Sequence, residues 1–323
     1  MQRRAAVLLL ASLVGMSGAQ AADPSTYPSA PIRLVSSYSA GGGNDLIARS
    51  VAAKLQTYFK QTVLVENREG GGGNIGVDYV AKAPADGYTL LVTAQSLTMR
   101  PALFKGSLPF DVRKDFAPLG IVGSFPIMFL ARPNAGFDSI PSMLAYAKAN
   151  PDKLSYGTPG VGTTQHVAME LFKAETGASL LHIPYRGASK AVTDAISGEI
   201  SVLVSTPSTV MPFVQQKQLR ILGTGEVARL PSLANAPTIG ETVKGFQVNN
   251  WLGLMAPAAT PQAIVDKLDK ALVAICNDPD FVRQLAAQGF VVKSQNAPAA
   301  RQQVEADLRK WGEVITAKQL RAE

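Results

Sequence analysis

The chain has very few of the residues that most enzymes use for their chemistry. Its 323 residues include one cysteine and two histidines. A single cysteine excludes an internal disulfide, and with only two histidines it falls short of a usual zinc site. The sequence also contains no G-x-S-x-G elbow, no H-E-x-x-H pair and no Walker P-loop. We therefore expect no catalytic residue, no metal and no other cofactor.

The charges lack the pattern of a nucleic-acid-binding protein. The formal net charge is +7; residues 1–21 contain two arginines and no acid, which leaves 29 basic against 24 acidic side chains, or +5. The basic residues are scattered, without a run interleaved with aromatics, so nucleic acid is not an expected partner. A mild positive charge instead helps to attract small anions.

A long hydrophobic run is missing everywhere except at the N-terminus. Met1–Arg4 is positive, Ala5–Gly18 is uncharged, and Ala19-Gln20-Ala21 places small residues where signal peptidase reads them. The run is too short to span a bilayer as a permanent helix. It predicts a secretory signal cleaved after about Ala21. No cysteine lies near the cut to carry a lipid, so we expect a protein released into the periplasm.

The remaining chain alternates strand-like and helix-like segments in two series. About 300 residues exceed what one core usually supports, so two domains are expected. The alternation predicts two α/β lobes of similar design, each built on a parallel sheet. The first series has predicted strands at 32–36, 62–66 and 88–93 and helices at 45–59 and 74–82. The second has strands at 154–157, 180–183, 200–205 and 219–223, and helices at 164–176 and from 187.

Two strand-like stretches without interruption, 121–131 and 247–255, are the expected connections between the lobes. From about Pro261 the chain is predicted to be helical, and its last helices would return to the first lobe. We therefore predict a signal peptide at 1–21, a first lobe of 22–125 with 252–323, and a second lobe of 126–251.

Two glycine-rich loops are the candidate binding elements. Ser39–Asp45 joins a strand to a helix, where glycines leave backbone N–H groups uncovered and the helix N-terminus adds partial positive charge. Such a loop suits a carboxylate or a phosphate, although one loop alone could be a plain turn. The loop 157–164 repeats the construction in the second lobe, so the pair predicts a cleft. Neither loop contains lysine or arginine, and Arg186 is the nearest plausible cation.

Two enzymatic interpretations compete with the cleft. Gly71–Gly76 matches the dinucleotide pattern G-x-G-x-x-G, but that pattern also needs an acidic residue about 20 positions later, at the end of the next strand. The next strand ends in Thr93-Ala94-Gln95 instead. A serine–histidine pair around His166 is the second alternative, and no acid stands beside it in the sequence to orient it.

Several motifs, in the same order, resemble the periplasmic receptors of tripartite tricarboxylate transporters, the Bug-type or TctC-like solute-binding proteins. The most specific is Val65–Arg68 followed by Gly72–Gly76. The others are Tyr27–Arg33, Gly41–Gly43 with Asp45, Asp86–Leu91, His182–Gly187, Leu230-Pro231 with Pro237-Thr238, Trp251–Leu254, and Ala256-Pro257 with Thr260-Pro261.

The resemblance implies a two-lobed Venus-flytrap fold of type II, with mostly parallel sheets flanked by helices and two crossovers. It also implies capture of a small organic carboxylate by a monomer, which delivers it to the large and small membrane subunits of the transporter. Loops of both lobes would hold the ligand. The predicted ligand-binding residues are Tyr38, Ser39, Ala40, Gly41, Gly42, Asn44, Thr93, Gln95, Ser96, Thr158, Gly162, Thr163, Thr164, His166, Tyr185, Arg186, Ser205 and Ser208.

Three positions depart from the family pattern. Glu69 stands where a proline is usual, and Ser201 and Ser205 stand where acidic residues are common. Without an acid at these serines, recognition of a ligand ammonium is disfavoured, so we expect a dicarboxylate or an aromatic acid rather than an amino acid. Two alternatives remain open: a sensing module that presents its closed form to a sensor kinase, and a periplasmic enzyme on the same scaffold.

Overall fold

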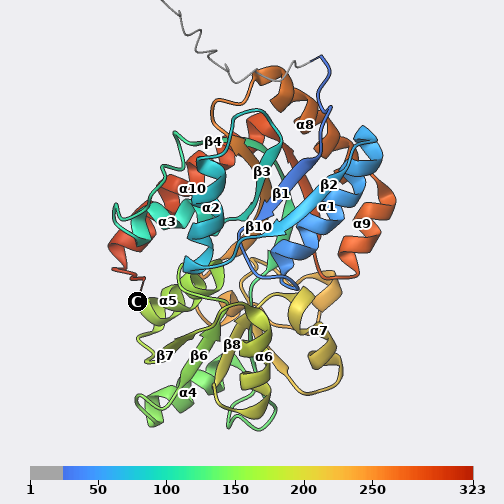
Figure 1. Cartoon of the computed structure of the whole chain (residues 1–323). Coiled ribbons are helices and arrows are strands. Elements are labelled where there is room, and N and C mark those ends of the chain that lie inside the picture. Colours follow the sequence, from blue (N-terminus) through green and yellow to red (C-terminus); the bar gives the residue numbers. More distant parts are fainter. Residues whose placement is uncertain (1–24, 323) are drawn as a thin grey trace, which may run out of the picture.

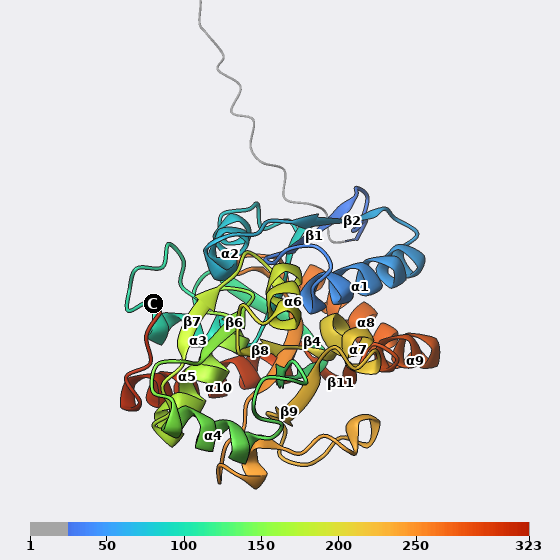
Figure 2. The same cartoon turned by 90° about the horizontal axis from the view of Figure 1, so that it is seen from below.

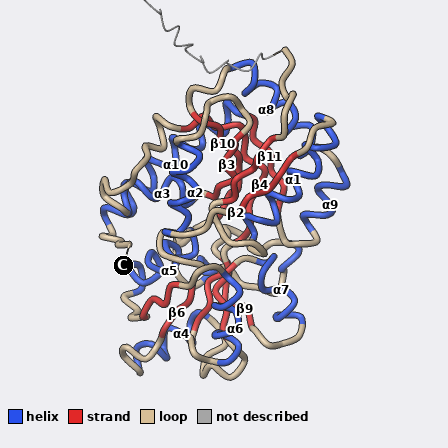
Figure 3. Tube along the Cα trace, viewed as in Figure 1, coloured by secondary structure: helices blue, strands red, loops and turns tan. Residues whose placement is uncertain are grey.

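The computed structural model describes residues 25–322, so the predicted signal peptide lies outside the described residues. Two α/β lobes lie one above the other, and each has a sheet covered by helices, as Figures 1 and 3 show. The predicted two-lobed α/β fold is confirmed. Within residues 25–322, no helix is both long enough and apolar enough to cross a membrane.

The first lobe is built on a six-stranded sheet in the order β11-β4-β10-β3-β1-β2. β1 (Ile32–Ser36) lies between β2 (Val63–Asn67) and β3 (Thr89–Ala94), and both pairings are parallel. The right-handed α/β crossovers that parallel pairing requires pass through α1 (Gly43–Phe59) and α2 (Asn74–Ala81). β3 is buried along almost its whole length, as expected for a strand covered on both faces.

The second lobe has a five-stranded sheet in the order β7-β6-β8-β5-β9. β6 pairs in parallel with β7 and β8, whereas β5 runs antiparallel to β8 and β9. The strands are β5 (Met128–Ala131), β6 (Ser155–Thr158), β7 (Leu181–Pro184), β8 (Val202–Ser205) and β9 (Arg220–Thr224). The helices are α4 (Ile140–Ala149), α5 (Thr164–Thr176), α6 (Ala188–Ser197) and α7 (Pro207–Gln215).

Long strands connect the lobes at the two places that the sequence suggested. β4 (Phe116–Pro126) is followed after one residue by β5 of the second lobe, and β10 (Asn249–Pro257) leads back. β4 and β10 pair with each other in antiparallel fashion over the whole of β10. Because β10 runs antiparallel to both β3 and β4, the first sheet is mixed rather than parallel throughout.

After β10 the chain returns to the first lobe, as Figure 1 shows in orange and red. It forms α8 (Gln262–Cys276), α9 (Pro279–Ala286), β11 (Val291–Asn296) and α10 (Ala297–Ala317). The expectation of helix alone beyond Pro261 was wrong for β11, an edge strand on β4 whose side chains are mostly exposed. It carries no alternating apolar pattern from which a strand could be recognised.

α3 (Ser96–Leu103), like α4 and α7 of the second lobe, was not predicted from the sequence. Most of its side chains are buried, so the segment has no polar face from which an amphipathic helix could be recognised. It also contains Pro101, a residue that usually argues against the interior of a helix. α3 packs against α10 beside the junction of the lobes. This places Arg100, a fully buried side chain, behind the loops that form the cleft.

The C-terminal part of α10 joins the two lobes. Trp311 and Ile315 belong to a buried cluster that also contains Phe172 and Val204 of the second lobe. At the middle of α10, Asp307 accepts a 2.7 Å hydrogen bond from the indole of Trp251 on β10. Trp251 is therefore buried at the junction, in line with a packing role. The residue limits proposed for the lobes stay a prediction.

Candidate functional site

A cleft of about 520 Å³ lies between the lobes. Its walls are loops that follow β1 and β2 of the first lobe and β6, β7 and β8 of the second. These are carboxyl ends of parallel strands, where ligands of open α/β sheets bind. β10 contributes the side chains of Asn250 and Leu252. Seen from below, α1 of the first lobe lies beside α6 and α7 of the second, as Figure 2 shows.

The first wall is the loop between β1 and α1. Gly42 is the N-cap of α1 and no side chain caps this helix, so the first-turn backbone N–H groups are not occupied by a cap. Asn44 and Asp45, residue types that commonly cap helices, do not do so here. Asp45 instead accepts the backbone N–H of Gly41 at 3.0 Å and the amide of Asn67 at 2.9 Å. Burial raises the pKa of Asp45, but hydrogen bonds from Arg49, Gly41 and Asn67 outweigh it and lower the pKa.

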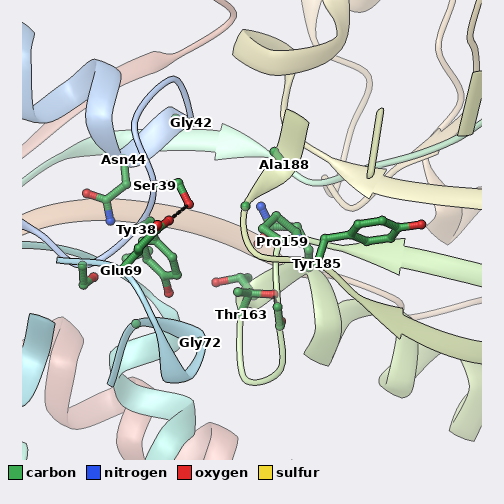
Figure 4. Close-up of a pocket in the computed structure, with 18 of the residues that line it drawn as sticks. Tyr38, Ser39, Gly42, Asn44, Glu69, Gly72, Pro159, Thr163, Tyr185 and Ala188 are labelled. Atoms are coloured by element: carbon green, nitrogen blue, oxygen red, sulfur yellow. Dashed lines mark hydrogen bonds between the residues drawn. The ribbon is translucent and has the colours of Figure 1, made fainter. Parts of the chain in front are cut away.

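Two polar side chains of this wall have no hydrogen-bond partner. Asn44 is 7% exposed and neither its amide oxygen nor its nitrogen is bonded; Ser37 is fully buried and its hydroxyl is likewise unbonded. Both line the cleft (Figure 4 labels Asn44). Unpaired buried polar groups cost about 1–3 kcal/mol each, so they mark a place where a polar ligand is stabilising.

The second wall is the loop between β2 and α2, Glu69–Gly73. Gly70, Gly71, Gly72 and Gly73 all have positive φ, a conformation that only glycine adopts without strain over several residues. Glu69 accepts a hydrogen bond from the Ser39 hydroxyl, shown as a dashed line in Figure 4. This loop was absent from the predicted site, although its glycines had been noticed as a dinucleotide pattern. The carboxylate of Glu69 is the one acidic side chain among the residues that line the cleft.

The two lobes touch across the cleft at this loop. A Cβ atom built on Gly72 would lie 1.8 Å from the carbonyl oxygen of Val161 in the second lobe, and one on Gly187 would lie 2.6 Å from the Ser39 hydroxyl. A Cβ atom at either position would collide with the opposite lobe, so only glycine fits there without a shift. The structure is therefore a closed arrangement of the lobes.

In the second lobe, the hydroxyls of the β6–α5 loop are used to hold the loop itself. Thr163 caps α5 through the His166 amide and donates to the Gly160 carbonyl at 2.7 Å. Thr164 donates to the Asn250 side chain at 2.8 Å, which ties the loop to β10. The hydroxyls expected to grip an anion are thus already bonded, and so are the backbone N–H groups of Gly160, Gly162 and Thr163.

His166 lies beneath this loop, inside the second lobe. Its ring stacks on His182 with centroids 4.3 Å apart, and His182 stacks on Tyr156 at 4.7 Å. Its Nδ1 accepts the Gly162 backbone N–H at 3.3 Å. Burial, followed by the neighbouring His182 and Lys173, lowers the pKa of His166 from its ordinary 6.5 to about 3. A neutral imidazole that holds Gly162 fits a supporting role for the loop.

The third wall consists of the beginnings of α6 and α7. Gly187 and Thr206 are their N-caps, neither helix has a side-chain cap, and both residues line the cleft. Tyr185 points away from Tyr38 and Glu69 in Figure 4 and donates its hydroxyl to Asp194 at 2.8 Å. Arg186 is exposed and is the one basic side chain among the lining residues.

The structure brings half of the predicted ligand-binding residues to the wall of the cleft. These are Tyr38, Ser39, Gly42, Asn44, Thr163, Thr164, Tyr185, Arg186 and Ser205. The other half lie behind the wall or beside it: Ala40, Gly41, Thr93, Gln95, Ser96, Thr158, Gly162, His166 and Ser208. Direct contact of any of them with a ligand stays a prediction.

Those behind the wall have partners that explain their positions. Thr158 is bonded to His182, Ser96 to Tyr38, and Gln95 to Asp307. The lining residues that were not named individually are Ser37, Gly43, Glu69–Gly73, Ile75, Ala94, Pro159, Gly160, Gln165, Gly187, Ala188, Thr206, Thr209, Asn250 and Leu252. Gly43, Pro159 and Gly160 belong to the two loops that were predicted as binding elements. Only the glycine runs among them carried a signal in the sequence.

The chemistry of the cleft favours an anion. Residues at or beside the N-termini of α1, α2, α5, α6 and α7 line it, namely Gly43, Ile75, Thr164, Ala188 and Thr206. Each helix N-terminus carries about half a positive charge, although the first N–H groups of α2 are bonded to carbonyls of its own loop. Within residues 25–322, no group of three or more histidine, cysteine or acidic side chains is placed to hold a metal ion. The arrangement can bind and orient a negatively charged molecule.

Comparison with known proteins places the chain among transport receptors. Residues 47–320 match the TctC family, described as the tripartite tricarboxylate transporter family receptor. The chain is 32% identical over 323 residues to a protein encoded in the tcbD–tcbE intergenic region of Pseudomonas sp. strain P51, covering 99% of this chain and 95% of that protein. It is 30% identical over 318 residues to BugT of Bordetella pertussis, covering 98% and 97%.

Solved structures agree with this placement. The periplasmic binding protein BugD is similar with a TM-score of 0.86 and 30% identity, over 92% of this chain and 100% of that one. Rpa4515 of R. palustris, solved with adipate, has a TM-score of 0.87 and 28% identity over 91% and 98%. MatC of Rhodopseudomonas palustris, solved with malate, has a TM-score of 0.84 and 25% identity over 90% and 100%.

The buried His166 makes folding stability depend on pH. Below its ordinary pKa of 6.5 the unfolded chain binds a proton on this residue, whereas the folded chain does not until about pH 3. The free energy of unfolding contributed by His166 is therefore fully present above pH 6.5 and falls by about 1.4 kcal/mol per pH unit below it. His166→Gln should reduce the loss of stability between pH 7 and pH 5 by about 2 kcal/mol, measured by urea unfolding. An unchanged pH dependence would contradict this.

Proposed function

The chain belongs to the TctC family of tripartite tricarboxylate transporter receptors, and we propose on that premise that it captures a small organic carboxylate in the periplasm. It then delivers this ligand, as a monomer, to the large and small membrane subunits of a tripartite transporter. It binds its ligand and does not convert it.

The convergence of helix N-termini from both lobes on one cleft carries this proposal. α1 and α2 approach from the first lobe, and α5, α6 and α7 from the second. α1 and α6 have no side-chain cap, so their first backbone N–H groups suit carboxylate oxygens. α7 begins with Pro207, which has no N–H, and contributes only the partial charge of its N-terminus. Asn44 and Ser37 add unpartnered polar groups at the same place. A site made this way selects a negatively charged ligand and does not by itself select the rest of the ligand's structure.

A dicarboxylate or an aromatic acid is the favoured ligand. The relatives solved with adipate and with malate support a dicarboxylate. Apolar lining from Ile75, Leu252 and the ring of Tyr38 supports an acid with a hydrophobic body. Glu69 favours the aromatic acid over the dicarboxylate, because its carboxylate repels the second carboxylate of a dicarboxylate held beside it.

Two other functions remain to be separated from transport by experiment. A sensing module would present the closed form to a sensor kinase, and deletion of the gene would then change transcription rather than uptake. A periplasmic enzyme would need turnover that is lost on replacing His166. The hydrogen bond from Gly162 to His166 favours a supporting role for this histidine over catalysis.

Carboxylates should stabilise the protein more than their neutral amides do. We expect at least one of succinate, adipate, malate and benzoate to raise the melting temperature, and succinamide and benzamide at the same concentration to raise it much less. A ligand at 100 times its Kd adds about 2.7 kcal/mol to the free energy of unfolding. The protein is first unfolded, dialysed and refolded so that no co-purified ligand masks the shift. No shift with any of the four acids would contradict the proposal.

Closure of the lobes is tested by Gly72→Ala. The new Cβ would collide with the Val161 carbonyl, 1.8 Å away, so we expect the Kd of the bound acid to rise at least about tenfold, or 1.4 kcal/mol. Gly71→Ala is the matched control: its φ is also positive, at 56°, but its Cβ would meet only the Asn74 side chain at 3.5 Å. Calorimetric titration measures both. Equal Kd values for the two variants would show that this contact is not needed.

The role of Glu69 in selectivity is tested by Glu69→Gln. Removing the negative charge should strengthen binding of succinate relative to benzoate by about fivefold, since the exposed carboxylate acts through a high effective dielectric. Glu66→Gln is the control, because Glu66 pairs with Arg33 and Arg68 and does not line the cleft. A succinate-to-benzoate ratio that stays constant in Glu69→Gln would rule out this role.

A further inference from the structure

Arg100 is the most unusual charged side chain in the structure. It lies on α3, its exposed fraction is 0%, and it is among the largest fully buried side chains. It was not among the predicted site residues, because it lies outside the two glycine-rich loops, which contain no lysine or arginine. An arginine carries its positive charge at any physiological pH, so this charge is held in the interior.

All partners of this guanidinium are neutral. Its Nη2 donates to the Gly72 carbonyl at 2.6 Å and to the Tyr38 hydroxyl at 3.0 Å, and its Nη1 donates to the Asn74 side chain. Its Nε has no partner. Among residues 25–322, no carboxylate oxygen lies within ion-pair distance of Arg100; every ion pair joins other residues.

The charge lies directly behind the wall of the cleft. A Cβ atom on Gly73 would be 2.8 Å from Nη2, and Gly73, Gly72 and Tyr38 all line the cleft. The guanidinium is thus separated from the cavity by one layer of protein. Glu69, the nearest acid along this loop, is bonded to Ser39 instead.

A buried cation without a counter-ion is costly, because its hydration is lost and no opposite charge replaces it. The same low dielectric lets its field act over a longer distance than in water. We infer that Arg100 is the buried counter-charge of the ligand's carboxylate, a positioning residue that acts through Tyr38 and the Gly72–Gly73 backbone without touching the ligand. This rests on the proposed carboxylate-binding function.

A purely structural role has to be distinguished from this electrostatic one. The same hydrogen bonds fasten the β2–α2 loop against Tyr38, so losing them would weaken binding of any ligand. An electrostatic role affects a charged ligand more than its neutral analogue. The informative quantity is therefore the ratio of the Kd of an amide to the Kd of its acid, measured with succinamide against succinate and with benzamide against benzoate.

Arg100→Gln and Arg100→Lys separate charge from shape. Gln keeps hydrogen-bonding groups but removes the charge, so the amide-to-acid ratio should fall at least tenfold. Lys keeps the charge on a different shape, so the ratio should stay within threefold of the wild type. If Gln and Lys change the ratio equally, or if Gln leaves it unchanged, the inference is wrong. Circular dichroism establishes that each variant is folded.

Asn74→Asp supplies a test that keeps Arg100 in place. It puts a carboxylate where the amide oxygen of Asn74 already accepts the Nη1 donor, and so gives Arg100 a permanent counter-ion. We expect a higher melting temperature without ligand together with an amide-to-acid ratio at least tenfold lower. If the new carboxylate only repelled the ligand, the ratio would fall without a rise in melting temperature. If Arg100 only fastened the β2–α2 loop, the amide-to-acid ratio would stay unchanged. Either result would overturn the inference.

These outcomes are distinct from failure of the proposed function. Wild-type protein that bound neither succinate nor benzoate, nor any other acid of the panel, would contradict the proposed function and the role of Arg100 with it. Wild-type protein that bound an acid in preference to its amide, with the preference retained in Arg100→Gln and Asn74→Asp, would overturn the role of Arg100 alone.

Discussion

Both connections between the lobes pass through one antiparallel ladder, in which β4 and β10 pair from Phe116 with Pro257 to Pro126 with Asn249. The loops that line the cleft follow strands of the two sheets, and these sheets are joined through this ladder. β3 pairs with β10 on one side, and β5 continues from β4 into the second sheet. A ladder of backbone hydrogen bonds fixes its two strands relative to each other, so we expect a hinge between the lobes where the strands leave the ladder.

The closed arrangement depends on residues too small to have side chains. Gly72 meets Val161 and Gly187 meets Ser39 across the cleft, at distances that no Cβ would allow. The Gly72 contact joins two backbones, and the Gly187 contact joins backbone to the Ser39 side chain, so a larger residue at either glycine would push the lobes apart. Hydrogen bonds to a charged ligand are stronger in a cleft narrowed in this way than in open solvent.

The charges around the cleft are arranged in depth. Arg186 and Glu69 lie on the wall, whereas Arg100 lies behind it and is sealed from solvent. A surface charge is screened by water and salt, and a buried charge is screened much less. Helix N-termini from both lobes add partial charges between these layers. A site of this kind attracts an anion with its surface and holds it with its interior.

The sequence by itself determined the class of fold and the class of site. The alternation of strands and helices predicted two α/β lobes. Glycine runs between a strand and a helix predicted the two loops that bring Gly42 and Thr163 to the cleft. Both signals can be recognised because they depend on a few neighbouring residues. Asn67, part of the most specific family motif, bonds to the Tyr38 carbonyl and to Asp45. Tertiary structure alone decided that Arg100 lies behind Gly73, that Glu69 reaches Ser39, and that His166 faces inward. Each of these contacts joins segments far apart in the chain or depends on which way a side chain turns, and neither property is encoded in a local pattern.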